Sequence, residues 1–102
     1  MSVARGATPT FTLTFREGID LTQAASVYVT FSSGKSVITK TGEDLTLTEN
    51  TIGVFLSQKD TLSFPIGEVE VQANWITSNN KRVVSEISKV KIDKQLLDRE
   101  IQ

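Results

Sequence analysis

The sequence predicts one all-β domain over residues 1–102, an immunoglobulin-like antiparallel β-sandwich of about seven strands. Apolar and polar residues alternate along several segments, which is typical of strands with one buried face. Turn signals separate these segments about every 8–12 residues, as in sandwich folds. Val and Thr, whose branched side chains favour strands, are abundant.

The strand nearest the start shows the alternation clearly, with Phe11, Leu13 and Phe15 interleaved with threonines. The seven expected strands are residues 10–15, 26–32, 35–41, 45–48, 51–56, 68–75 and 82–92. The turns between them are expected at Ser33-Gly34, Gly42 to Asp44, Glu49-Asn50 and Asn79-Asn80. Trp75 lies on the apolar face of its strand and is expected in the core.

Three segments interrupt the strand pattern. Residues 16–24 are expected to cross from one sheet to the other. Residues 57–62 are expected to form a short helical turn, with Ser57 as its N-cap and Pro65 preventing its continuation. Residues 93–102 form a C-terminal tail, helical or extended, whose composition favours a helix.

The last hairpin permits a prediction of strand register. If Asn79-Asn80 form a two-residue loop, opposite charges face each other across the ladder, which is favourable. The facing pairs would be Glu70–Lys89, Glu68–Lys91, Val69–Val90 and Trp75–Val84. The same register would set Ala73 against Glu86 and bury a carboxylate. We therefore expect a β-bulge between Glu86 and Lys89.

Composition excludes several classes of function. The 11 basic and 12 acidic residues give a net charge of −1, which argues against binding nucleic acid by charge. Without cysteine or histidine, the chain cannot form a Ser-His-Asp triad or the usual zinc and copper sites. No cofactor is expected. No polybasic stretch favours a membrane surface, no apolar run reaches the ~20 residues of a membrane span, and the start is too polar for a signal peptide.

Carboxylates occur in near pairs, which is the one pattern that admits catalysis. The pairs are Glu17 with Asp20, Glu43 with Asp44, Glu68 with Glu70, and Asp98 with Glu100. A glycosidase needs two carboxylates in a cleft, one of them with a raised pKa. Turns and polar strand faces do not favour such a shift, so a carboxylate hydrolase is a remote alternative. Glu43-Asp44 is also a weak signal for calcium.

Several exposed residues are candidates for a contact surface. Tyr28 shares the polar face of its strand with small hydroxyl residues, and Phe55 opposes the parity of its apolar neighbours. Such aromatics can bind a sugar or a protein, although isolated apolar residues on a surface are common. The threonine stripe Thr10, Thr12 and Thr14 marks an edge strand that could pair with another chain, or simply a polar outer face.

The tail supplies a second candidate contact. Leu96, Leu97 and Ile101 are too few to stabilise a free helix. We expect them to pack on the sandwich, on a second copy in a homo-oligomer, or on a partner.

The opening ARGATPTFTLTF, residues 4–15, resembles a start common among small proteins of Firmicutes-type prophages. Residues 50–61 follow that family's N-T-I-x-V-x-L-[ST]-Q-x-[DE]-T pattern and residues 67–73 its G-x-V-x-[IV]-Q-[AV] strand, while residues 97–101 resemble its L-x-[DE]-E-[IV] terminus. The family is similar to the N-terminal domain of phage baseplate upper proteins, which joins receptor-binding parts to the baseplate core.

This resemblance implies a non-enzymatic structural or assembly module of a phage tail or baseplate. Its partners would be other phage tail or baseplate proteins, with no role for nucleic acid or membrane. The protein would be made in the cytoplasm of the bacterial host and would act in the virion. The resemblance carries over no functional residues. A module that binds carbohydrate on a host surface, through Tyr28 and Phe55, stays as the alternative.

Overall fold

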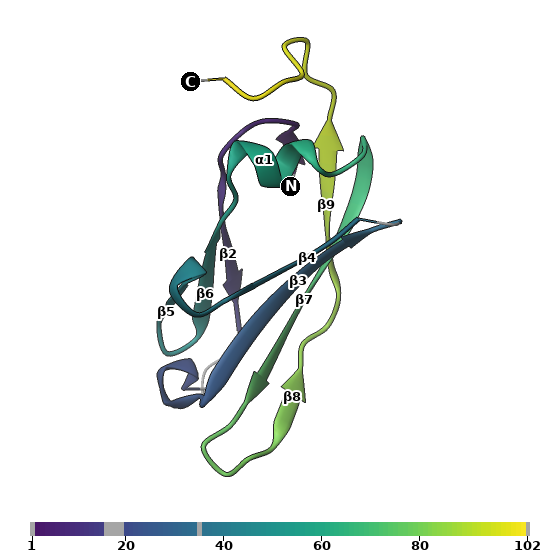
Figure 1. The fold of residues 1–102 in the computed structure, drawn as a ribbon. Coiled ribbons are helices and arrows are strands. Elements are labelled where there is room, and N and C mark those ends of the chain that lie inside the picture. The colour runs from purple at the N-terminus through teal and green to yellow at the C-terminus, as the bar shows by residue number, and fades with distance from the viewer. Residues whose placement is uncertain (1, 16–19, 35, 102) are drawn as a thin grey trace.

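The chain folds into two stacked β-sheets (Figure 1). This computed structural model describes residues 2–15, 20–34 and 36–101. Within that part, the larger sheet contains β1 (Ser2–Ala4), β3 (Ser26–Ser33), β4 (Ser36–Thr41), β7 (Gly67–Ile76), β8 (Arg82–Val84) and β9 (Ser88–Asp93). The smaller sheet contains β2 (Thr10–Thr14), β5 (Leu45–Leu47) and β6 (Thr51–Phe55). The predicted all-β sandwich is confirmed.

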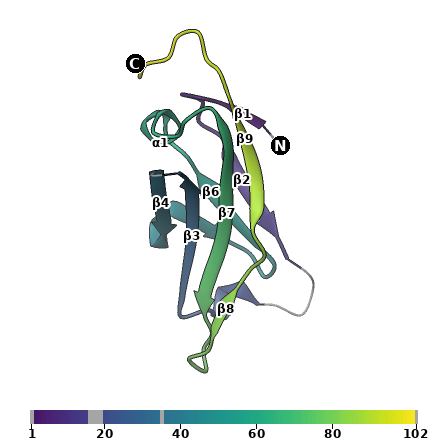
Figure 2. The ribbon, with the colours of Figure 1, turned by 90° about the vertical axis from the view of Figure 1, so that its right-hand side faces the viewer.

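The larger sheet has the order β1-β9-β7-β3-β4, with β8 also pairing with β7, and the smaller has the order β2-β6-β5. Figure 2 shows the larger sheet in front, with β2 and β6 behind it. The prediction of a purely antiparallel fold is wrong in one place, because β1 pairs parallel with β9. These strands lie near opposite ends of the chain, so no hairpin forces them to be antiparallel.

The described residues form nine strands where the sequence predicts seven. One addition is β1, and the other arises because the strand expected at 82–92 is divided into β8 and β9. Residues 16–24 do join the smaller sheet to the larger, since they link β2 to β3. They include a 3-10 turn, η1 (Leu21–Gln23), while residues 16–19 lie outside the described residues.

The predicted register of the last hairpin is correct at one end and wrong at the other. Glu70 faces Lys89 and Glu68 faces Lys91, as expected. Trp75 faces Val83 rather than Val84, because the loop has three residues, not two. Its backbone closes with Thr77 N–H donating to Lys81 O at 2.8 Å, and Asn80 takes the left-handed conformation with φ 63°.

The one-residue difference between the two registers is absorbed at 85–87, between β8 and β9. This interruption confirms the predicted bulge, and Glu86 there is exposed to solvent rather than buried against Ala73.

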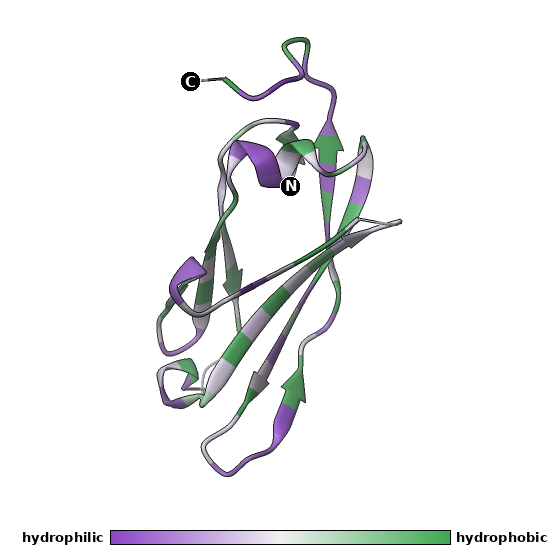
Figure 3. Cartoon of the chain, in the orientation of Figure 1, coloured by the Kyte–Doolittle hydropathy of each residue, from purple (hydrophilic) through white to green (hydrophobic). Residues whose placement is uncertain are grey.

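The core fills the space between the sheets, and Figure 3 shows hydrophobic residues alternating with polar ones along the strands. Trp75 is 5% exposed, as predicted, and packs edge-on against Phe15 with ring centroids 5.2 Å apart. Phe31 contacts both Phe11 and Phe64, with ring centroids 5.7 and 6.1 Å apart. The other buried hydrophobic residues are Val3, Leu21, Val27, Val29, Ile52, Val54, Leu56, Val69, Val71, Ala73, Val90 and Ile92.

The predicted helical turn is α1 (Gln58–Leu62), which closes one end of the sandwich (Figure 1). Ser57 caps it as expected, in a capping box with Asp60. The buried Thr61 donates to Ala7 O at 2.8 Å and so joins α1 to the segment before β2. A second 3-10 turn, η2 (Gly42–Asp44), links β4 to β5. The tail beyond β9 is not helical through residue 101.

Candidate binding surfaces

The β2 strand forms one edge of the smaller sheet, and its outer face is the threonine stripe. Thr10, Thr12 and Thr14 are exposed, as the sequence predicts for an edge strand. The five residues of β2 carry no charge. Natural edge strands often carry charged side chains that keep them from pairing with other strands, and β2 carries none.

The backbone groups of the same threonines point away from the sheet. Phe15 N–H donates to Asn50 O at 2.7 Å, and Leu56 N–H donates to Pro9 O at 3.0 Å. In an antiparallel ladder these bonds recur at every second residue, so Thr10, Thr12 and Thr14 direct N–H and C=O to the free side. No hydrogen bond within the described part of the chain satisfies those groups. The β2 edge can therefore accept another strand.

A groove of about 710 Å³ runs between the β2 edge and the interrupted flank of the larger sheet. Its apolar lining is Leu13, Phe15, Val71, Trp75 and Val83, and its polar lining is Thr12, Thr14, Ser85, Glu86 and Ser88. The groove exists where β8 ends and β9 has not yet begun, so the larger sheet is narrow there. We call this feature the β2 groove. Its described lining contains a single charge, the Glu86 carboxylate.

Tyr28 lies over a second, shallow hollow of about 440 Å³ on the outer face of the larger sheet. Arg82 donates to Asn74 Oδ1 from Nε at 3.1 Å and from a terminal nitrogen at 2.9 Å, which holds both side chains in place. Thr30 and Thr39 share a hydroxyl hydrogen bond of 3.2 Å across the strands. A half-exposed ring beside amide, guanidinium and hydroxyl groups is suited to a polar ligand with one apolar face.

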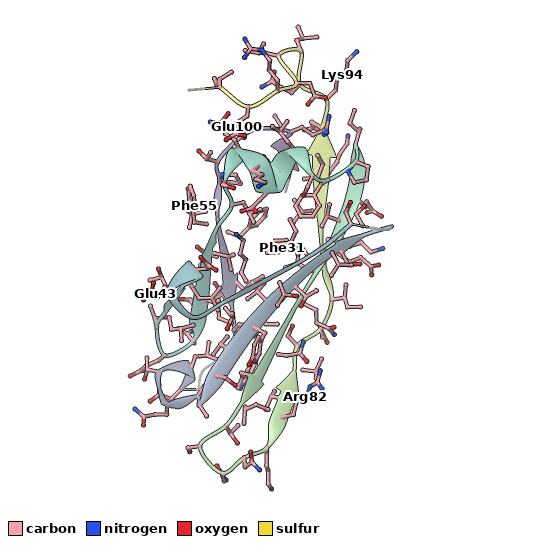
Figure 4. The ribbon with its side chains drawn as sticks, in the orientation of Figure 1. Phe31, Glu43, Phe55, Arg82, Lys94 and Glu100 are labelled. Carbon is pink, nitrogen blue, oxygen red and sulfur yellow. The ribbon has the colours of Figure 1, made fainter. Side chains whose placement is uncertain are left out.

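Phe55 is on the other sheet, so the two aromatics proposed from the sequence do not share a surface. Figure 4 shows Phe55 projecting from β6, with Arg82 on β8 toward the opposite end. Phe55 faces Thr10 across the ladder and borders a hollow of about 390 Å³ with Glu43 and Asp44. Of the sequence-predicted residues, the structure therefore joins Phe55 to the threonine stripe and leaves Tyr28 apart.

Asp60 lies in the same hollow as Phe55 and is held by a lysine. Lys40 Nζ is 2.8 Å from Asp60 Oδ2, and each side chain is 17% exposed. Burial by itself would raise the pKa of Asp60, but the bond from Lys40 and the Ser57 N–H bond outweigh it and lower the pKa. A general acid needs the opposite shift.

The paired carboxylates that lie within the described residues are exposed to solvent. Glu43 and Asp44 belong to η2, whereas Glu68 and Glu70 are exposed on β7. Asp98 and Glu100 lie in the tail, Asp20 caps η1, and Glu17 is outside the described residues. No group of three or more acidic residues in the described ranges could hold a metal ion.

The tail places its three apolar side chains in solvent. Leu96 is 91% exposed, Leu97 49% and Ile101 48%. Side-chain contacts hold the segment near α1: the Gln58 amide exchanges two hydrogen bonds of 2.8 Å with the backbone of Ile101, and Arg5 pairs with Asp98. The prediction that these side chains pack on another surface stays a prediction, because Leu96 and Leu97 are exposed in the described chain.

Sequence reasoning missed the β2 groove and the polar frame around Tyr28. The groove depends on where the larger sheet is interrupted, and the shift in apolar parity between Ile87 and Val90 was the local sign of it. The side chains of Asn74 and Arg82 are neighbours because the loop has three residues. The register expected from the sequence assumed a two-residue loop, so it did not bring them together.

Comparison with models of protein families and with curated proteins gives no match to this chain. None of the helices described is long and apolar enough to cross a membrane.

Proposed function

We propose that this chain is a non-enzymatic structural module of a bacteriophage tail or baseplate, which assembles with other tail proteins through protein–protein contacts. The sequence resemblance in residues 4–15 and 50–61 motivates the phage setting. Synthesis in the host cytoplasm and incorporation into the virion belong to the same proposal.

The observation that carries a docking role is the β2 edge with its groove. Thr10, Thr12 and Thr14 offer three N–H donors and three C=O acceptors in a row, spaced as in a β-ladder. The groove beside them has an apolar floor. Together they suit an extended segment that adds a strand to the smaller sheet, the mode in which main-chain bonds give affinity and side-chain pockets give selectivity.

The test is direct binding of the purified chain to each tail or baseplate protein encoded beside its gene. Thr12→Pro removes the outward N–H without breaking a bond to β6, because that N–H does not serve the ladder. We expect it to weaken binding at least about tenfold, while the matched Thr12→Val, which keeps the N–H, has little effect. Binding to none of these proteins, or equal binding by both variants, would refute the proposal.

A second candidate function is supported by the hollow beside Tyr28. A ring framed by Asn74, Arg82 and hydroxyl groups is the arrangement in which a sugar can stack and hydrogen-bond. If the hollow binds host cell-wall glycans, Tyr28→Ala should abolish binding, whereas Phe55→Ala on the other sheet should not. Absence of glycan binding by the unaltered chain would dismiss this function.

A further inference from the structure

The β2 groove defines what can occupy it. The occupant must be extended, so that its backbone bonds to the outward groups of Thr10, Thr12 and Thr14. Its side chains must alternate, apolar toward the floor and polar toward the threonine face. A cation among them would complement Glu86, the single charge in the described lining.

A second copy of β2 meets only the first requirement. Two β2 edges could exchange main-chain hydrogen bonds, and neither strand carries a charge that would repel the other. However, Phe11 is buried in its own core, and Leu13 and Phe15 pack against it. A second β2 thus has no free apolar side chain with which to fill the groove, and its outer face offers only threonines.

Residues 97–101 of a second copy meet all three requirements. In an extended conformation Leu97, Arg99 and Ile101 lie on one face, while Leu96, Asp98 and Glu100 lie on the other. The first set brings two apolar side chains with a cation between them. The guanidinium of Arg99 can reach the groove rim at Glu86 while its methylene stem stays on the apolar floor. No sheet hydrogen bond would have to be broken to free this segment.

In this structure the tail does not occupy its own groove. The tail lies at the end of the molecule with α1, whereas β8, which borders the groove, lies at the other end (Figure 1). The molecule is 47 Å along its longest axis. Eight extended residues span about 28 Å, and the five residues of β2 about 17 Å. The tail of one copy is therefore long enough to line the whole β2 edge of the next.

We infer that residues 94–101 of one copy add as a strand to β2 of a neighbouring copy, with Leu97 and Ile101 in the β2 groove and Arg99 paired with Glu86. The inference rests on the proposed docking role of β2 and names its partner. Because tail and groove are different surfaces, two copies can exchange tails reciprocally in a two-fold dimer, or successive copies can bind head-to-tail, which generates a ring if the rotation closes and a filament if it does not. The contacts of Gln58 and Arg5 hold the tail in the isolated copy and give way when it is exchanged.

The test is the mass of the purified full-length chain by sedimentation equilibrium over a wide range of concentration. We expect association that Leu97→Asp weakens at least about tenfold, since it places a charge on the groove floor. Leu96→Asp is the matched control and should leave association unchanged, although Leu96 is the most exposed of the three apolar tail residues. If the association came instead from non-specific hydrophobic contact, Leu96→Asp would weaken it more than Leu97→Asp, and the inference would be overturned.

A charge exchange tests the register. Arg99→Glu should weaken association, Glu86→Arg should do the same, and the double variant should restore it, whereas Lys94→Glu should have little effect. Trp75 is the only tryptophan and lines the groove, so its fluorescence should change with association. A chain that stays monomeric up to about millimolar concentration, or a dimer that no tail variant alters, would refute the inference.

These outcomes are separable from failure of the proposed function. If the chain does not associate with itself but binds a neighbouring tail protein in a way that Thr12→Pro weakens, the β2 edge is a docking site with a different occupant. If Thr12→Pro changes neither self-association nor binding to tail proteins, both the inference and the proposed function fail.

Discussion

Replacement of Asp60 tests how α1 is fixed to the sandwich. Asp60 Oδ2 accepts from Ser57 N–H at 2.9 Å, which completes the capping box, and from Lys40 Nζ at 2.8 Å, which ties α1 to β4. Asp60→Ala removes both interactions and leaves the Lys40 ammonium without its partner in a site where it is 17% exposed.

The two contributions can be estimated separately. Loss of the hydrogen bond from Ser57 N–H costs about 1 kcal/mol, while the cap made by the Ser57 side chain remains. Loss of the pair costs about 1–2 kcal/mol, between the values for surface and fully buried pairs. We therefore expect Asp60→Ala to lower the free energy of unfolding by about 2–3 kcal/mol, and the melting temperature by about 10–20 °C. Asp60→Asn can still accept from Ser57 and should cost only the Lys40 contribution.

The assay is urea unfolding followed by the fluorescence of Trp75, at several pH values. The folded-state pKa of Asp60 is lowered from its ordinary value of 3.8. The carboxylate thus contributes stability that is fully present above the unfolded pKa and is lost as pH falls through the folded pKa. The difference between the unaltered chain and Asp60→Asn should be constant at neutral pH and shrink below pH 3.8. A cost under about 0.5 kcal/mol for Asp60→Ala, within the range of ordinary surface changes, would refute this account.

Three further substitutions test other parts of the fold by the same unfolding assay. Arg5→Lys loses the guanidinium that donates to Phe64 O at 2.9 Å and to Leu62 O at 2.6 Å, and should lower the free energy of unfolding by about 1–2 kcal/mol. An unchanged stability would show that these two hydrogen bonds are dispensable. Gly42→Ala should cost about 1 kcal/mol through its φ of 59° alone, since nothing lies within 4 Å, and Gly42→Asn should cost less. Phe31→Ala should lower the free energy of unfolding by about 3–5 kcal/mol, because it opens a cavity at the centre of the aromatic cluster. A loss below about 1.5 kcal/mol would mean that neighbouring side chains collapse into the cavity.

The parts of the fold that sequence reasoning predicted depend on local patterns. Alternation with period two placed Trp75 in the core, and the serine at Ser57 placed the start of α1. The bulge near Glu86 followed from a conflict that is visible in the sequence, because a regular ladder would have buried its carboxylate.

The parts that were missed depend on contacts between distant segments or on loop geometry. The parallel pairing of β1 with β9 leaves no local signal in a three-residue strand. The register error at Trp75 came from one residue of loop length, which Asn79-Asn80 did not specify. The tail, whose composition favours a helix, does not form one, since a short helix in water needs packing that the described chain does not offer.

In the described part of the chain, five strands have a free side, and they differ in how that side is protected. β1, β5 and β8 have three residues each, so they present little backbone to another chain. β4 is longer but carries Lys40 and leads into the acidic turn η2. β2 has five residues, no charge and no described cover on its free side. Such an edge is a liability in a protein that acts alone, because it invites unwanted pairing. Its presence beside an apolar groove is better explained if another chain normally covers it, and the strand-exchange variants above decide which chain that is.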